Sequence, residues 1–93
     1  MATFLLYGSY SMDAIGKISA KRSDDAAALI KGLGGKIKGG YATLGKHDLV
    51  LIVELPGTKE AMKASVGLAK LLGISFTTAP AVSVEEFDKL MAG

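Results

Sequence analysis

His47 is the only histidine of the chain, and it directly precedes Asp48. A histidine beside a carboxylate can act as a general base, because imidazole titrates near neutral pH. Successive side chains in a turn or strand point in opposite directions, so adjacency alone does not make a catalytic dyad. The structural alternatives are an exposed turn histidine and an Asp48 carboxylate that accepts hydrogen bonds from turn amides. His47 and Asp48 are therefore catalytic candidates without a defined reaction.

Five hydroxyl-bearing side chains form a second set of candidates. They occupy predicted sheet positions and are Tyr7, Tyr10, Tyr41, Ser75 and Thr77. If one face of the sheet lines a cavity, one or two of these hydroxyls can orient a small ligand. The alternative is that the tyrosines pack in an interface between subunits, with their hydroxyls bound to backbone or water.

Other chemistries lack the residues they need. The chain has no cysteine, and a single histidine with scattered carboxylates lacks the spacing of metal ligands, so we predict no metal site. The glycine pairs are not followed by Gly-Lys-Ser/Thr, and no cofactor fingerprint or nucleophile elbow is present, so we predict no cofactor. Arg22, the only arginine, can bind a carboxylate or lie at the surface.

Charge and hydropathy narrow the partners and the compartment. The formal net charge is +2, and the short basic pairs have no interleaved aromatic residues, so we expect no nucleic-acid partner. No apolar run approaches the roughly 20 residues of a membrane span, and the first residues do not resemble a secretory signal. We expect a cytoplasmic, bacterial-type protein without a membrane partner.

The candidates are positioned by residues 35–55, which are predicted to form two strands joined by a turn at residues 45–48. In the second strand, Leu49, Leu51 and Val53 lie on one face. Val50 and Ile52 make the other face apolar as well. A sheet covered by helices on one side only should alternate apolar and polar residues. Both faces of this strand therefore need to be covered.

The flanking segments supply two more strands, at residues 3–10 and 74–79, and several helices. Ser11 is the predicted cap of a short helix at 12–18, and Ser23 of a longer one that ends at the glycines 34–35. A third helix follows Thr58, and its inner stripe is predicted to be Met62, Val66, Ala69 and Leu72. Ser83 begins a capping box, Ser-Val-Glu-Glu, and so predicts a C-terminal helix.

This order predicts one α+β domain over residues 1–93, with a ferredoxin-like βαββαβ arrangement, an antiparallel sheet and a C-terminal helix. Both main helices of such a fold lie on one face of the sheet. Forty-nine per cent of the residues are hydrophobic, which is high for a chain this small. We therefore expect a homodimer or larger homo-oligomer in which two sheets pair as a dimeric α/β barrel. The alternative is that the tail helix covers the second face.

The order of these elements resembles the GYD domain family over essentially the whole chain. The likeness lies in the opening strand, the helix stop at Gly34-Gly35, the VEEFDKL tail and the Gly-x-x-Asp turn. The family's Gly-Tyr-Asp turn corresponds to Gly45, His47 and Asp48, with histidine in place of the usual tyrosine. The family is similar to dimeric α+β barrel proteins, which implies paired sheets around a cavity and implies no particular activity. The turn also resembles the ligand-sensing domains of leucine-responsive regulators, which implies at most a stand-alone sensor module.

Two functional hypotheses follow. The first is a small-molecule-binding or assembly module, a homo-oligomer with an unidentified ligand in a cavity between paired sheets. The second is a cofactor-independent enzyme of the barrel type, such as an isomerase or monooxygenase, that uses His47, Asp48 or a tyrosine. Whether an ionisable side chain faces an enclosed pocket distinguishes them.

Overall fold

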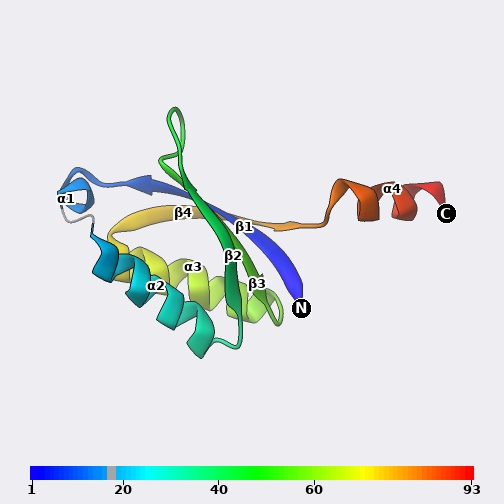
Figure 1. Cartoon of the computed structure of the whole chain (residues 1–93), viewed down its shortest axis with the longest axis horizontal. Coiled ribbons are helices and arrows are strands. Elements are labelled where there is room, and N and C mark those ends of the chain that lie inside the picture. Colours follow the sequence, from blue (N-terminus) through cyan, green and yellow to red (C-terminus); the bar gives the residue numbers. More distant parts are fainter. Residues whose placement is uncertain (17–18) are drawn as a thin grey trace.

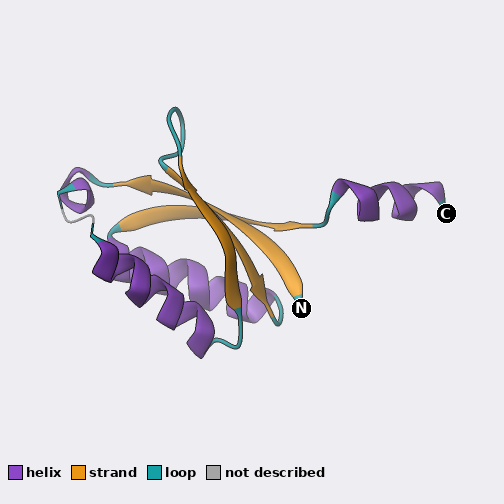
Figure 2. Cartoon of the chain, in the orientation of Figure 1, coloured by secondary structure: helices purple, strands orange, loops and turns teal. Residues whose placement is uncertain are grey.

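A computed structural model describes residues 1–16 and 19–93. In these residues the elements are β1 (Ala2–Tyr10), α1 (Met12–Ile15), α2 (Ala20–Gly32), β2 (Lys36–Ala42), β3 (Leu49–Leu55), α3 (Thr58–Leu72), β4 (Ile74–Ala81) and α4 (Val84–Ala92). The sheet is antiparallel with strand order β2-β3-β1-β4, and α2 and α3 lie together on one of its faces (Figures 1 and 2). This arrangement confirms the predicted ferredoxin-like fold.

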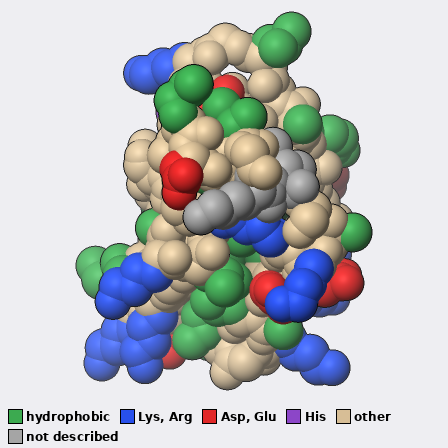
Figure 3. Space-filling view, turned by 90° about the vertical axis from the view of Figure 1, so that its left-hand side faces the viewer, with side chains coloured by type: hydrophobic (Ala, Val, Ile, Leu, Met, Phe, Trp, Pro, Cys, Tyr) green, Lys and Arg blue, Asp and Glu red, His purple; other side chains and the backbone are tan. Residues whose placement is uncertain are grey.

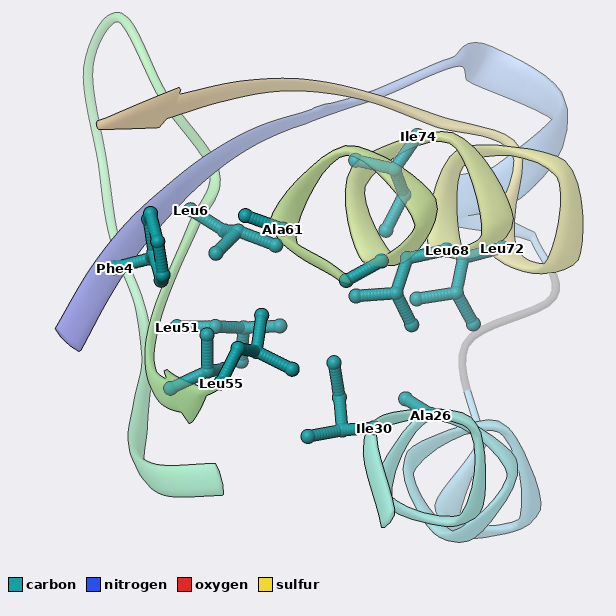
Figure 4. Close-up of a cluster of buried hydrophobic side chains, with 12 residues drawn as sticks. Phe4, Leu6, Ala26, Ile30, Leu51, Leu55, Ala61, Leu68, Leu72 and Ile74 are labelled. Carbon is teal, nitrogen blue, oxygen red and sulfur yellow. The ribbon is translucent and has the colours of Figure 1, made fainter. Parts of the chain in front are cut away.

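The core lies between the sheet and the two main helices (Figure 4). Alternate residues of the central strands, such as Leu6 and Val53, point into it and are completely buried. Ile30 of α2 and Leu68 of α3 meet them from the other side and are equally buried. Alternation along the strands and a helical repeat along the helices thus converge on one core, as the sequence pattern predicts.

The buried stripe of α3 differs from the prediction. Met62 and Val66, expected inside, are 65% and 56% exposed. Leu72 is buried as predicted, but the other buried residues of α3 are Ala61, Ala64 and Leu68. Both sets repeat with helical spacing, and the prediction favoured the set with larger side chains. Small alanines at the contact allow α3 to lie close to the sheet, and this tertiary requirement decides which stripe is buried.

The segment before the first main helix also differs in detail. α2 begins at Ala20, and its cap is Ser19, whose hydroxyl accepts a hydrogen bond from Arg22 N–H. Ser23, the predicted cap, lies inside the helix. Ser11 caps α1 as predicted, but α1 ends at Ile15, and residues 17–18 of the helix predicted at 12–18 lie outside the described residues.

Two adjacent glycines, Gly39 and Gly40, lie in the middle of β2 at an irregularity of the sheet. The pairing of β2 with β3 shifts by one residue between Ile37 and Gly39, which is a β-bulge. Gly40 next to it faces the helix layer, where a Cβ atom would lie 3.0 Å from a methyl group of Leu51. The bulge and the small residues leave space between β2 and α2, and the pocket described below lies there.

The C-terminal helix stands apart from the rest of the chain (Figures 1 and 2). Ser83 caps it as predicted, accepting a hydrogen bond from Glu86 N–H at 3.0 Å. No residue of α4 is buried. The alternative in which this helix covers the second face of the sheet is therefore wrong for the chain as described. Across residues 1–16 and 19–93, no helix has the length and apolar content needed to span a membrane.

Candidate functional site

Asp48 sits at the end of the β2–β3 turn and holds the turn against β1. Its carboxylate accepts a hydrogen bond from Tyr10 N–H at 2.9 Å, and its own N–H donates to the Gly8 carbonyl at 2.8 Å. The Asp48 carbonyl accepts from Thr43 N–H at 2.9 Å, closing the turn. The Asp48 carboxylate thus takes the place of a backbone carbonyl as the acceptor for Tyr10 N–H, at a point where β3 has not yet begun. The sequence suggested instead that this carboxylate would accept hydrogen bonds from the turn amides.

His47 lies on the other side of the turn, with its ring against Tyr7. The two ring centroids are 5.2 Å apart and the planes are tilted by 37°. The His47 carbonyl accepts a hydrogen bond from the Thr43 hydroxyl at 2.7 Å. Its Nδ1 atom is buried and has no hydrogen-bond partner among the described residues. His47 and Asp48 are thus both part of the turn, and the Asp48 carboxylate is engaged by Tyr10 N–H.

The face of the sheet opposite α2 and α3 is open, and its centre on β1 and β3 is apolar. Leu5 and Tyr7 of β1 lie beside Ile52 and Val50 of β3 in the register, and all four are only half buried. Of the polar candidates, Ser75 and Thr77 are exposed, and the register pairs Thr77 with Tyr7. The sequence argument that both faces of β3 need to be covered therefore applies to the observed fold.

A pocket of about 440 Å³ lies on the other side of the sheet, under the first half of α2. It exists because the residues facing each other across this layer are small: Ala26 and Ala27 on α2, Gly40 and Ala42 on β2. Its apolar lining comes from β2, β3, β4 and the end of α3, namely Ile37, Leu49, Leu51, Leu72 and Ile74. A ligand with an apolar part of modest size fits such a lining.

Polar groups gather at the α2 side of this pocket. Ser19, Arg22 and Ser23 line it, all from the first turns of α2. The Arg22 guanidinium also donates to the carbonyls of Ala14 and Leu71, at 3.4 and 3.3 Å. These carbonyls lie in the last turns of α1 and α3, where a cation is favoured by the helix dipole. Arg22 thus joins three helices and brings a positive charge to the pocket.

The structure divides the five predicted ligand-binding residues between two places. Tyr7, Ser75 and Thr77 belong to the open face, whereas Tyr10 lines the pocket under α2. Tyr41 borders both: it lines the pocket, and its ring lies 4.0 Å from the position a Cβ of Gly39 would take, on the open-face side with Ile52. These five residues therefore do not form a single cluster.

Sequence analysis missed the serines of this pocket and gave Arg22 no place in it. Ser23 was predicted to be a helix cap, Ser19 was not singled out, and Arg22 was considered either a ligand for a carboxylate or a surface residue. The available signal is the run of alanines at positions 26–28 together with the glycines at 39–40, which leaves space between two elements far apart in sequence. In the described part of the chain, no group of three or more His, Asp or Glu side chains is arranged to hold a metal ion.

Comparison with solved structures supports the fold. The leucine response regulatory protein LrpA of Mycobacterium tuberculosis is similar to this chain with a TM-score of 0.59 and 10% sequence identity, over 89% of this chain and 51% of that one. A structure described as a mutant of Rv3291c gives a TM-score of 0.60 at 10% identity, over 90% and 52% of the two chains. This chain thus spans about half the length of the structures it matches.

Comparison with protein sequences gives the family. No curated protein matches this sequence. The family model of the GYD domain matches residues 4–91, which include β2, β3, β4 and both main helices in full, with most of β1 and α4. The match spans the turn with His47 and Asp48 that carried the resemblance in the sequence. The chain belongs to the GYD domain family.

Proposed function

We propose that this domain is a small-molecule-binding module that works as a homo-oligomer. Its ligand is an amphipathic molecule with a short apolar body and a carboxylate or similar anionic group. The observation that carries the proposal is the pocket under α2, where an apolar floor meets Arg22 and two serine hydroxyls at one side. The pocket lies on the helix side of the sheet, so it forms within one chain and does not require a partner.

The chemistry of the pocket selects this class of ligand. Leu49, Leu51 and Leu72 offer an apolar surface that favours a hydrocarbon chain over water. Arg22 has five N–H donors in a planar fork and carries a permanent positive charge, which suits a carboxylate. Ser19 and Ser23 can add hydroxyl donors at the same side. A ligand with a hydrocarbon chain and a carboxylate could place the chain on the apolar surface and the carboxylate beside Arg22.

Octanoate is a suitable probe, and octanol is its neutral counterpart. Titration of the ¹⁵N-labelled protein should shift the amide signals of residues around the pocket, and octanoate should bind more tightly than octanol because only it carries a charge for Arg22. An Ala27→Phe variant places a phenyl ring in the pocket and should weaken octanoate binding at least tenfold. Ala28→Phe is the matched control, since Ala28 is the next residue of α2 and does not line the pocket.

Two results would contradict the proposed site. The first is that Ala27→Phe and Ala28→Phe bind octanoate equally well. The second is that octanoate shifts signals of Tyr7, Val50 and Ile52 instead of signals around α2, which would place the ligand at the open face. That outcome would favour the cavity between paired sheets that the sequence predicts.

Assembly is supported by the open face itself. Leu5, Tyr7, Val50 and Ile52 form a contiguous apolar surface on the two central strands, and no helix of the described chain covers it. Exposed apolar surfaces of this kind on soluble proteins commonly mark interfaces. Two copies that pair through this face would form the barrel that the resemblance implies, with the pockets under α2 on the outside.

A further inference from the structure

In the described part of the chain, α4 is a helix with no buried residue. It has nine residues, and an isolated helix of this length is marginal in water. Between the end of β4 and the start of α4 lie only Val82 and Ser83, and the backbone at Ser83 is extended, with φ −63° and ψ 155°. The helix therefore continues in the direction of β4 and leaves the body of the molecule (Figure 1).

One side of this helix is apolar and the other is acidic. Val84, Phe87, Leu90 and Met91 fall within about a third of the helical circumference and are all at least half exposed, Phe87 least at 50%. Glu86 and Asp88 border this apolar side, and on the far side Lys89 pairs with Glu85 at 3.5 Å. An amphipathic helix of this kind packs its apolar side against another apolar surface.

The outer side of α3 has the matching properties. Met62 and Val66 are exposed and one turn apart, the same spacing as Phe87 and Met91 on α4. α3 carries three lysines, at positions 59, 63 and 70, and a single glutamate. Figure 3 shows Lys and Arg side chains gathered over the lower part of the molecule, where Figure 1 places α2 and α3, with hydrophobic side chains between them.

We propose that α4 of one molecule packs on the outer side of α3 of a second copy of this chain. The row of Phe87 and Met91 would lie beside the row of Met62 and Val66, an arrangement typical of helices that pack with interdigitating i, i+4 ridges. Glu86 and Asp88, which border the apolar side of α4, would lie near the lysines of α3, and this charge complementarity favours α3 as the docking surface.

Other surfaces fit α4 less well. On the open sheet face Lys36 is already paired with Glu54 at 3.5 Å, and the Glu54 carboxylate would repel the acids of α4. In its described part the outer side of α2 exposes no large apolar side chain. The proposal concerns an interface beyond the proposed function, and it uses neither the pocket under α2 nor the pairing of open faces.

Disulfide trapping tests the contact directly, because the chain has no cysteine of its own. The double variant Val66→Cys/Met91→Cys replaces two exposed residues, so folding should be preserved. Under mild oxidation at micromolar protein, we expect most of it to become covalent dimer on a non-reducing gel. Ala28→Cys/Met91→Cys and Val50→Cys/Met91→Cys are matched controls that place the first cysteine on α2 and on the open face, and we expect little dimer from them.

A second measurement separates this contact from pairing through the open face. Phe87→Ser removes the central apolar residue of α4 and should weaken self-association at least tenfold in sedimentation, with octanoate binding unchanged. The proposal is overturned if Val66→Cys gives no more dimer than the controls, if the disulfide forms within one chain, or if Val50→Cys gives the higher yield. If the protein does not bind octanoate but Val66→Cys/Met91→Cys still forms the covalent dimer, the proposed pocket under α2 is contradicted and the α3–α4 contact is supported.

Discussion

Replacing Asp48 by alanine should destabilise the domain without disturbing its backbone pairing. The Asp48 carboxylate is the acceptor for Tyr10 N–H at 2.9 Å, at a part-buried position where β1 runs past the start of β3. The backbone hydrogen bonds of residue 48, to Gly8 and Thr43, do not depend on the side chain. The alanine variant therefore isolates the contribution of one acceptor that bridges two strands.

The expected magnitude follows from the charge of the acceptor. A hydrogen bond to an ionised group contributes about 1.5–3 kcal/mol, against about 0.5–1.5 kcal/mol for a neutral one. Asp48→Ala should thus lower the free energy of unfolding by about 2 kcal/mol, and Asp48→Asn, which keeps an acceptor oxygen, by about 1 kcal/mol. For a domain of this size 1 kcal/mol corresponds to about 4–8 °C in Tm.

Urea unfolding followed by circular dichroism measures these differences. All variants are compared at one protein concentration, since the proposed assembly would make the apparent stability depend on it. Asp24→Ala on the exposed surface of α2 is the control, and its effect should stay within about 0.5 kcal/mol. An Asp48→Ala variant as stable as the control would refute the structural role of this carboxylate. It would also leave the side chain free for the catalytic role that the sequence suggests.

Three further predictions follow from packing. Leu68→Ala should lower the free energy of unfolding by about 2–5 kcal/mol, whereas Met62→Ala should lower it by less than about 1 kcal/mol. Chemical denaturation measures both, and equal decreases in the free energy of unfolding would contradict the buried stripe of α3. Gly35→Ala should lower Tm strongly because its Cβ would collide with the Glu54 carbonyl. Gly32→Ala, with no atom within 4 Å of its Cβ, should be neutral or stabilising by up to about 1 kcal/mol. Ile52→Lys on the open face should shift the sedimentation coefficient toward the monomer, with no shift for Ala28→Lys.

The arrangement of strands and helices was predictable from the sequence because several signals agree. Alternation predicts that Leu6 and Tyr7 lie on opposite faces of the first strand, and in the structure Leu6 is in the core and Tyr7 on the open face. Ser83, with glutamate three residues later, marks the start of α4 correctly. Each of these depends on local chemistry or on a period that one segment shows by itself.

The errors arose where two local choices were equivalent. Ser19 and Ser23 are four residues apart, and either can cap a helix; the structure uses Ser19. On α3 two stripes have helical spacing, and only the distance between helix and sheet selects the one with alanines. Such choices are made by tertiary contacts, which no single segment encodes.

The pocket under α2 could not be predicted from the sequence for a related reason. The pocket exists because two segments both lack large side chains where they face each other. Ala27 and Gly40 line it, and each is an ordinary residue for its own helix or strand. Volume left between elements becomes visible only when the elements are placed side by side. The candidates chosen from the sequence were polar groups on strands, whereas the charged group at the pocket, Arg22, is on a helix.

Composition also gains a physical explanation. Almost half of the residues are hydrophobic, yet only thirteen hydrophobic residues form the buried core of the described chain. The remaining large apolar side chains are not scattered evenly: α3 and α4 expose several, whereas the described α2 exposes none. A chain that merely tolerated exposed apolar residues would have no reason to exclude them from one helix. This segregation favours contacts with further copies through α3, α4 and the open face as the reason for a composition too apolar for a single small core.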